Sequence, residues 1–397
     1  MQVDPAGHVT SPRGFLAGAA YAGVKTYGEG KLDLAILVSE RPCSTAAVFT
    51  RSRLHAAAVD IDRAKLAVRP ARGVVVNAGV ANASTGERGM ADGYELARLA
   101  AARAGIPDDE MLVCSTGVIG HFLPMEKLAA AMPAIELTPA GGPLFARAIM
   151  TTDTRPKTGA VRFGPYTIGG ACKGSGMIHP DMATMLAFLT TDAPVENACL
   201  DAAFRRAVDD SFNLVSVDGD TSPSDTAVIF ANGAAGGDMI SAGHPLASDF
   251  EAALRALCVH LAKEIARDGE GATKLVEFTV TGAATPEDAR RLVRLLSTSY
   301  LLKSAIHGAD PNWGRIAAVI GRSGVQLDEA AVAIDLCGTR VYERGRPTAF
   351  DPDALSAAMR GTDVTVAVHL GAGREAATGW GCDLSAEYVS INADYHT

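Results

Sequence analysis

Several features that define common protein classes are missing from this sequence. The seven cysteines are scattered and never form a CxxC pair, so neither a disulfide framework nor a zinc knuckle is predicted, and a reducing compartment is expected. No run of 18 apolar residues occurs, so no membrane-spanning segment is predicted. The first residues lack the basic start and apolar stretch of a signal peptide. We therefore expect a cytoplasmic protein.

The charge balance argues against nucleic acid as a partner. The 397-residue chain has a formal net charge of -9 and no cluster of Lys and Arg with interleaved aromatic residues, so a phosphate backbone would be repelled. Its nine histidines include no HExxH motif and no close pair, so no metal site is predicted. With 48% apolar and 20% charged residues, the composition is typical of a globular protein that buries a core.

Four motifs that would indicate other functions are incomplete or absent. Residues 371–376 open like a dinucleotide fingerprint but lack its third glycine, so a hairpin loop is predicted there. Residues 218–225 have the first acidic positions of a calcium loop, but Pro223 stands where that loop needs glycine, which favours a turn before a strand. The sequence contains no G-x-S-x-G elbow, and the turn after Lys173 lacks the spacing of a phosphate loop.

Short β-rich runs alternate with longer helical patterns, which is typical of a mixed α/β fold. Strands are predicted at 34–38, 73–77, 111–115, 226–231 and 275–281. Helices are predicted at 93–104, 125–131, 197–211, 245–268 and 285–297. The pattern restarts near residue 283, and further strands are predicted at 331–336, 364–370 and 388–392. A small C-terminal α/β domain is therefore expected.

The most unusual stretch is a glycine-rich turn followed by a proline and an apolar run. It reads Gly169-Gly-Ala-Cys-Lys-Gly-Ser-Gly-Met-Ile-His-Pro-Asp-Met-Ala-Thr184-Met-Leu-Ala-Phe-Leu. Such a pattern indicates a loop that delivers the chain into a buried element. Composition alone favours Thr184 as a β-branched residue that opens a core strand.

This stretch resembles the processing site of the ornithine acetyltransferase family, also called the glutamate N-acetyltransferase family. The resemblance covers nearly the whole chain, because further segments match the family's pattern in order. They are residues 12–15, 47–51, 76–86, 115–120, 150–154, 216–221, 225–226, 231–233, 268–274, 307–315 and 391–397. The chain departs from the pattern at Val80, Ser84, Pro223 and Ser224. The family implies a layered α/β sandwich, shared with self-cleaving aminopeptidases that use an N-terminal nucleophile, and a smaller C-terminal α/β domain.

The resemblance implies that the chain cuts itself between Ala183 and Thr184. The Thr184 hydroxyl would attack the Ala183 carbonyl, and hydrolysis of the resulting ester would leave Thr184 as a new N-terminus. Its α-amine titrates near about 7.7 to 8.0, so it can serve as the base for the hydroxyl. The first chain would comprise residues 1–183. In the second chain, residues 184–282 would complete the main domain and residues 283–397 would form the C-terminal domain.

The family also assigns roles to the residues around the nucleophile. Thr116 and Gly117, predicted to form a sharp turn after a strand, match its oxyanion hole. Amino-acid substrates require complementary charges; by resemblance Lys173 pairs with a carboxylate, and Glu270 meets an ornithine ammonium. Further substrate positions match at Thr151, Thr152, Asn392 and Thr397. Without the resemblance, each of these residues would be interpreted as part of a turn or a solvated loop.

The implied activity is transfer of acetyl from N2-acetyl-L-ornithine to L-glutamate in two half-reactions, without a cofactor, in cyclic arginine biosynthesis. Some family members also take acetyl-CoA, and the sequence leaves open whether this chain does, and whether glutamate is its natural acceptor. The mature species implied is an α2β2 heterotetramer. Two alternatives stay open at this point: a self-cleaving aminopeptidase or amidohydrolase that gives the acyl group to water, and an uncleaved binding protein.

Overall fold

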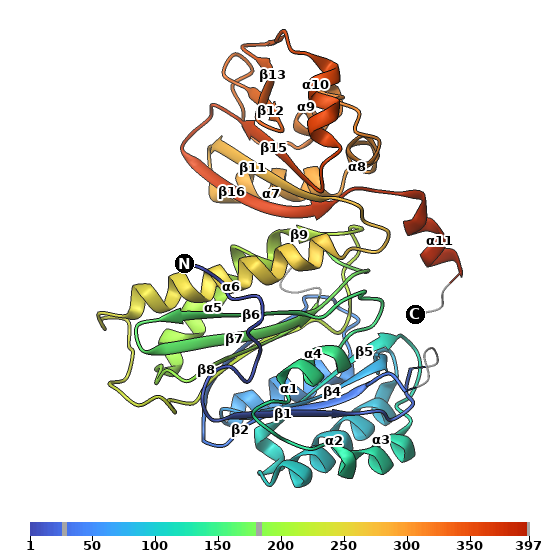
Figure 1. Cartoon of the computed structure of the whole chain (residues 1–397), viewed down its shortest axis with the longest axis vertical. Coiled ribbons are helices and arrows are strands. Elements are labelled where there is room, and N and C mark those ends of the chain that lie inside the picture. The colour runs from blue at the N-terminus through green and yellow to red at the C-terminus, as the bar shows by residue number, and fades with distance from the viewer. Residues whose placement is uncertain (26–29, 180–184, 395–397) are drawn as a thin grey trace.

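The computed structural model describes residues 1–25, 30–179 and 185–394 of the chain (Figure 1). Its strands form three sheets, of four, five and seven strands. The first two sheets stack face to face between helices, and the third forms a C-terminal unit beside them (Figure 1). The predicted mixed α/β class is confirmed. None of the helices in these ranges is both long enough and apolar enough to cross a membrane.

The first sheet has the strand order β1-β2-β4-β5. Its strands are β1 (Phe15–Ala20), β2 (Leu34–Ser39), β4 (Gly73–Val80) and β5 (Met111–Val118). Strands β4 and β5 run parallel, and the other neighbours run antiparallel. Its outer face packs against α1 (Ala57–Val68), α2 (Gly86–Ala104) and α3 (Met125–Ala131).

The second sheet has the strand order β3-β10-β8-β7-β6. Its strands are β3 (Ser44–Phe49), β6 (Lys157–Phe163), β7 (Tyr166–Lys173), β8 (Leu186–Thr191) and β10 (Thr226–Ala231). Strands β8 and β10 run parallel at its centre. Its outer face packs against α5 (Asn197–Asp209) and α6 (Ala247–Arg267), while α4 (Gly142–Ala148) lies against the inner face of the first sheet.

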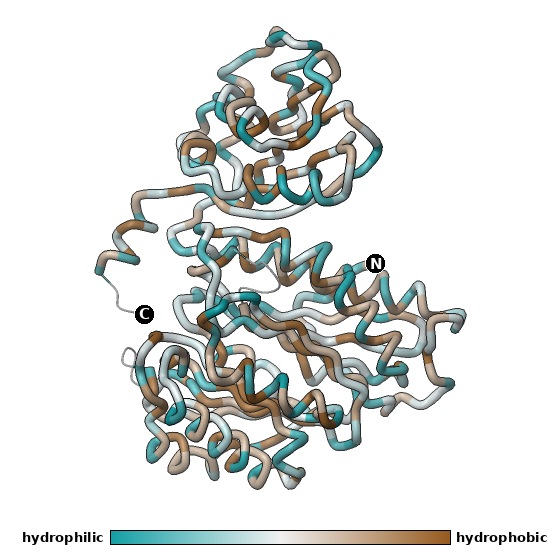
Figure 2. The backbone as a smooth tube through the Cα atoms, turned by 180° about the vertical axis from the view of Figure 1, so that it is seen from behind, coloured by the Kyte–Doolittle hydropathy of each residue, from teal (hydrophilic) through white to brown (hydrophobic). Residues whose placement is uncertain are grey.

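A continuous apolar core joins the two sheets. Val74 and Val76 of β4 pack toward the second sheet, whereas Val75 between them packs toward the helices, as the two-residue period of a strand requires. Phe145 and Phe188 meet edge to face at 5.2 Å between ring centroids, and truncating such a buried ring typically costs about 3–5 kcal/mol. Figure 2 shows that hydrophobic segments concentrate in these inner strands. This core holds the two sheets in a fixed relation.

The third sheet has the strand order β14-β13-β12-β15-β11-β16-β9. Its strands are β9 (Val215–Ser216), β11 (Leu275–Ala283), β12 (Ala333–Leu336), β13 (Thr339–Glu343), β14 (Arg346–Pro347), β15 (Asp363–His369) and β16 (Glu375–Cys382). The helices of this part are α7 (Pro286–Ser297), α8 (Tyr300–His307), α9 (Trp313–Arg322), α10 (Pro352–Met359) and α11 (Ala386–Asp394). The small C-terminal domain is predicted to start at residue 283. Two strands of this sheet begin earlier in the chain: β11 begins at Leu275, and β9 lies before α6.

Helix α7 shows how local chemistry sets an element boundary. The Thr285 hydroxyl accepts a hydrogen bond from the Asp288 amide at 3.1 Å, and Pro286 occupies the first helical position. Both features favour a helix start, because the cap satisfies an amide that has no partner inside the helix. Such signals explain why the predicted start of this helix, at Thr285, agrees with the structure.

Two local predictions in the C-terminal part of the chain are wrong. Residues 388–392 are helical, within α11, and not a strand. The alternation of apolar residues there misleads, because no residue of α11 is buried and Val389 is 63% exposed. Residues 371–376 do not close a hairpin, since β11 lies between β15 and β16. The connection instead crosses the end of β11, a non-local pairing that local spacing cannot reveal.

Candidate active site

A cavity of ≈ 210 Å³ collects the residues that the sequence singles out. Every predicted site residue that the structure describes lines it: Thr116, Gly117, Thr151, Thr152, Lys173, Glu270 and Asn392. Three other predicted residues, Ala183, Thr184 and Thr397, lie outside the described residues. The cavity therefore joins segments from β5, from the end of β7, from the turn after α6 and from α11.

Thr116 and Gly117 lie inside strand β5, not in a turn after it as predicted. Strand β5 continues to Val118, and its pairing with β4 shifts register around Gly79 and Val80. Gly117 has a φ of +127°, and a Cβ on it would lie 2.3 Å from the Gly79 carbonyl carbon. This β-bulge re-aims the strand toward the cavity, and only glycine fits its backbone.

Two buried polar side chains hold the bulge in place. The Ser115 hydroxyl donates to Asn77 Oδ1 at 2.6 Å, and Asn77 Nδ2 donates to the Val80 carbonyl at 2.8 Å. Both side chains are almost fully buried, so their bonds are not exchanged with water and losing one partner would leave the other unsatisfied. The cavity wall at Thr116 and Gly117 is therefore a rigid feature of the first sheet.

Lys173 ends strand β7 and brings a positive charge to the cavity. Its Nζ donates to the Thr151 hydroxyl at 3.4 Å. Burial lowers the pKa of Lys173, while the carboxylates of Asp153 and Asp225 on either side oppose that change. An amine placed in this way is suited to pairing with an anionic group of a ligand, because such a group would compensate for its lost hydration.

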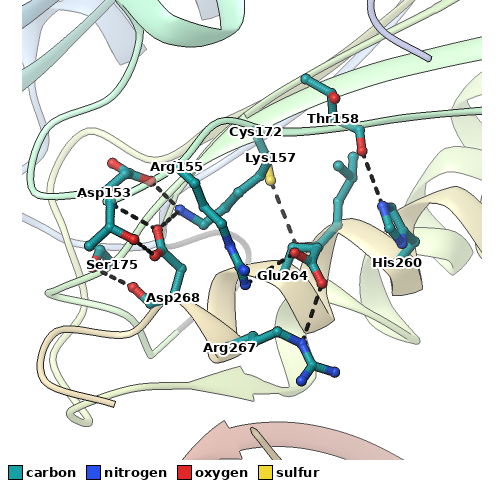
Figure 3. Close-up of polar contacts among 12 residues, drawn as sticks. Asp153, Arg155, Lys157, Thr158, Cys172, Ser175, His260, Glu264, Arg267 and Asp268 are labelled. Carbon is teal, nitrogen blue, oxygen red and sulfur yellow. Dashed lines mark hydrogen bonds and ion pairs between the residues drawn. The ribbon is translucent and has the colours of Figure 1, made fainter. Parts of the chain in front are cut away.

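A buried ionic cluster joins Lys157, Asp153 and Asp268 (Figure 3). The Lys157 ammonium contacts Asp153 Oδ1 and Asp268 Oδ2, each at 2.5 Å, and all three side chains are at most 4% exposed. Asp153 also accepts the amides of Gly174 at 2.7 Å and Thr151 at 2.9 Å. The cluster therefore fixes the backbone on both sides of the cavity at Thr151 and beside Lys173.

The electrostatics of Asp153 reflect these contacts. Burial alone raises the pKa of its carboxyl, but the charges of Lys157 and Lys173 and the Gly174 amide outweigh burial and lower that pKa to about 2. Burial likewise opposes the charge of Lys157, yet the two carboxylates raise the pKa of its ammonium. Asp153 is therefore charged at neutral pH, and its role is to hold the surrounding backbone in place.

The turn after Lys173 is anchored at successive residues. The Ser175 hydroxyl donates to the Asp268 carbonyl at 2.6 Å. Asp218 accepts the amides of Met177 at 2.6 Å and Ile178 at 2.9 Å. The carboxylate in the calcium-like segment thus binds backbone amides, and the described part of the chain contains no group of three or more potential metal ligands.

His179 is the last described residue before the predicted cleavage point. Arg294 Nη2 lies 2.8 Å from its Nε2, and the Ser216 hydroxyl lies 3.1 Å from its Nδ1. Since a guanidinium can only donate, Nε2 accepts and Nδ1 carries the proton. On the far side, the Thr226 amide donates to the Met185 carbonyl at 3.1 Å. Both flanks of residues 180–184 are therefore held by hydrogen bonds.

Glu270 supplies a negative charge to the same cavity. Its Oε2 accepts Asn392 Nδ2 of α11 at 2.8 Å, and its amide donates to the Ser175 carbonyl at 3.0 Å. A Cβ on Gly176 would lie 2.3 Å from Glu270 Oε1, so glycine leaves room for the carboxylate in this position. Helix α11 thus returns from the third sheet to the site (Figure 1).

Asp225 is a cavity residue that the sequence did not assign to the site. It immediately precedes β10, is 2% exposed, and its Oδ2 has no hydrogen-bond partner within the described ranges. Burial raises the pKa of Asp225 well above its ordinary value, and Lys173 opposes this only in part. The available signal was an acidic residue next to a fully buried strand, in a segment that matches the family.

The arrangement suits acyl transfer involving an amino acid. A small cavity holds one amine, Lys173, and one carboxylate, Glu270, beside a bulged strand at Thr116 and Gly117. Opposite charges at two points recognise a zwitterion, and donors on a rigid strand can stabilise an oxyanion.

Comparison with known proteins gives the family. The ArgJ family model matches residues 16–397. The arginine biosynthesis bifunctional protein ArgJ of Dehalococcoides mccartyi is 47% identical over 401 residues, which cover 100% of this chain and 99% of that protein. The protein of the same name from Thermus thermophilus is 50% identical over 390 residues, covering 98% and 100%.

A solved structure is similar as well. The crystal structure of ArgJ from Bacillus halodurans has a TM-score of 0.51 and 40% identity, and the match covers 52% of this chain and 97% of that one. The chain belongs to the ArgJ family of arginine biosynthesis enzymes. The family predicted from the motifs is confirmed.

Replacing Gly117 by alanine should damage the cavity wall. The substitution places a Cβ against Gly79 at an unfavourable φ, so we expect acetyl-transfer kcat to fall by at least about 10²-fold, the usual cost of losing one oxyanion donor. Gly120→Ala is the control, because Gly120 also has a positive φ but no atom within 4 Å of its added Cβ. Wild-type kcat in Gly117→Ala would contradict the assignment.

Replacing Lys157 by methionine should leave two buried carboxylates without a cation and lower the free energy of unfolding by about 3–5 kcal/mol at neutral pH. Because the pKa of Asp153 is held at about 2, below its unfolded value, its stabilisation is full above about pH 4 and is lost as the pH falls toward 2. The difference between wild type and variant should therefore shrink in acid.

Urea denaturation at several pH values measures this difference. Lys263→Met is the matched control, since its pair with Glu277 is 38% and 34% exposed and such pairs contribute about 0–1 kcal/mol. Equal losses in the two variants would show that the buried cluster has no special role.

Proposed function

We propose that the chain cuts itself between Ala183 and Thr184, and that Thr184 then carries an acetyl group from N2-acetyl-L-ornithine to L-glutamate. The observation that carries this proposal is the cavity itself. All described residues predicted to bind substrate or an oxyanion line it. Asp225 on the same cavity directly precedes Thr226, whose amide bonds to Met185, the residue that follows Thr184.

A length comparison supports the cleavage. Full-length relatives align along 99–100% of their own length with this whole chain. The solved Bacillus halodurans chain aligns along 97% of its length with only 52% of this chain, so it is about half as long. Residues 184–397, the second fragment proposed here, likewise make up just over half of the sequence.

The described residues suggest a role for each part of the substrate. Lys173 pairs with the α-carboxylate, and Glu270, held by Asn392, faces the ornithine ammonium. Thr116 and Gly117 stabilise the oxyanion that forms at each acyl transfer. Thr151 and Thr152 complete the binding wall. Thr397 belongs to the proposal on its motif alone, since it lies outside the described residues.

The acetyl group moves in two half-reactions. Thr184 Oγ attacks the acetyl carbonyl of the donor, ornithine leaves, and the acetyl ester on Thr184 is then attacked by the α-amine of glutamate. The α-amine of Thr184, created by the cleavage, takes and returns the hydroxyl proton. This chemistry needs no cofactor, and acetyl-CoA as a second donor is part of the proposal for a bifunctional enzyme. We further propose a cytoplasmic α2β2 assembly.

Substitutions at Thr184 test whether its hydroxyl is the nucleophile or whether the residue has only a structural role. Thr184→Ala should leave one intact chain without transferase activity, because the attacking oxygen is gone. Thr184→Ser keeps a hydroxyl and should retain some cleavage and some transfer. Thr191→Ala serves as control, since this threonine of β8 bonds to the Thr167 carbonyl at 2.8 Å and lies outside the cavity. Denaturing gels and ornithine release provide the measurements. A cleaved, active Thr184→Ala variant would rule out this nucleophile.

Glutamate dependence distinguishes transfer from hydrolysis. With N-acetylornithine alone, a transferase should release about one ornithine per site and stop, because the acetyl ester waits for an amine. Adding glutamate should restart release and form N-acetylglutamate in equal amount. Continuous ornithine release without glutamate would identify an amidohydrolase instead.

A further inference from the structure

Two carboxyl groups flank Lys173 and differ sharply in their surroundings. Asp153 accepts two backbone amides and the Lys157 ammonium. Asp225, equally out of solvent, leaves Oδ2 without a partner in the described structure, and this residue lines the cavity. The positive charge of Lys173 favours the charged form of Asp225, and hydrogen bonds from Ser222 favour that form as well.

These surroundings shift the pKa values of the two acids in opposite directions. The pKa of Asp153 is lowered to about 2, whereas burial raises the pKa of Asp225 well above its ordinary value despite Lys173 and Ser222. Pairs of acids whose environments separate them in this way commonly divide into a permanently charged group and a group that exchanges a proton. The surroundings of Asp225 are of the second kind, and this residue lines the cavity.

Register places Asp225 beside the head of β8. Thr226 lies opposite Leu186 in the parallel pairing of β10 with β8, and the Thr226 amide donates to the Met185 carbonyl. Asp225 is therefore one residue from the backbone bond that holds Met185. Because neighbouring strands lie about 4.8 Å apart, its carboxyl is close to the start of the strand that follows the cleavage point.

The proposed transfer needs a second place for a proton. An amino acid enters with an α-ammonium, which must lose a proton before its nitrogen can attack. The departing amino acid leaves as an ammonium, so its nitrogen must gain one further proton beyond the hydroxyl proton. The α-amine of Thr184 already handles the hydroxyl proton, so the substrate nitrogen requires another acid and base.

We propose that Asp225 stores this second proton between the two half-reactions, as acid to the leaving α-amine and as base to the incoming α-ammonium. This role rests on the proposed function. In the first half-reaction the acetyl C–N bond breaks and a C–O bond forms to Thr184. The leaving nitrogen receives the hydroxyl proton and the Asp225 proton, and departs as an ammonium.

The second half-reaction reverses these transfers. The incoming ammonium gives one proton to the Asp225 carboxylate and one to Thr184 Oγ, and keeps the third on the new amide. A C–N bond forms and the C–O bond breaks. Asp225 ends protonated, as it began, and no proton is gained or lost over the cycle.

The test uses Asp225→Asn, which keeps the volume but cannot store a proton. Asp62→Asn is the matched control. Asp62 is also fully buried, its Oδ2 also lacks a partner in the described part, and burial also raises its pKa, but it lies on α1 outside the cavity. For each protein, cleavage is followed on denaturing gels, and deacetylation of the acetyl-enzyme is followed with two acceptors.

The acceptors are glutamate and hydroxylamine, an amine that is largely unprotonated at neutral pH. We expect cleaved Asp225→Asn to transfer to glutamate about 10²- to 10⁴-fold more slowly, the usual range for a lost general base. Transfer to hydroxylamine should stay within a few-fold of wild type. Equal losses with both acceptors, or no loss with glutamate, would overturn the role of Asp225.

If the Asp225→Asn variant fails to undergo cleavage, a measurement on the wild-type enzyme still tests the proposal. The rate of acetyl-enzyme with glutamate should rise with pH through an ionisation that is absent with hydroxylamine. The same pH dependence for both acceptors would overturn the proposal. If neither wild type nor Asp62→Asn forms an acetyl-enzyme, the proposed function itself fails, which is a distinct result.

Discussion

The Lys157 ammonium between Asp153 and Asp268 is the interaction on which the site depends most. It joins the start of β6, the segment beside Thr151 and the end of α6, which are distant in sequence. Through Asp153 it also fixes Gly174. A buried charge of this kind is strongly destabilising without its partners. The cluster therefore couples the stability of the second sheet to the position of the cavity wall.

The remaining geometry follows from close approaches of backbone and side chain. Gly117 lets β5 bulge against β4, and Gly176 leaves room for the Glu270 carboxylate. Asn392 then ties that carboxylate to α11 at the far end of the chain. The layered core holds these pieces at one place, because both sheets are packed on both faces. A cationic and an anionic group consequently meet in one small cavity.

Elements with a strong period were predictable from the sequence, as helix 285–297 shows, because burial of Leu292, Val293 and Leu296 on one face imposes the pattern. The strand predicted at 388–392 was wrong because this segment is a helix without a buried residue, so no core face dictates its apolar pattern. The end of β5 was misplaced, since a bulge depends on the neighbouring strand. Motif resemblance brought the site residues together, but Asp225 was missed: only the structure reveals its burial and its unpaired oxygen.

The central claim is that a threonine freed at the head of β8 carries the acetyl group. Intact-mass analysis of purified enzyme incubated with N-acetylornithine, without glutamate, tests it most directly. The account predicts two polypeptides, of residues 1–183 and 184–397, with one added acetyl group on the second, located at Thr184 and lost when glutamate is added. A single continuous chain, a second fragment that begins at another residue, or an acetyl group elsewhere would contradict it.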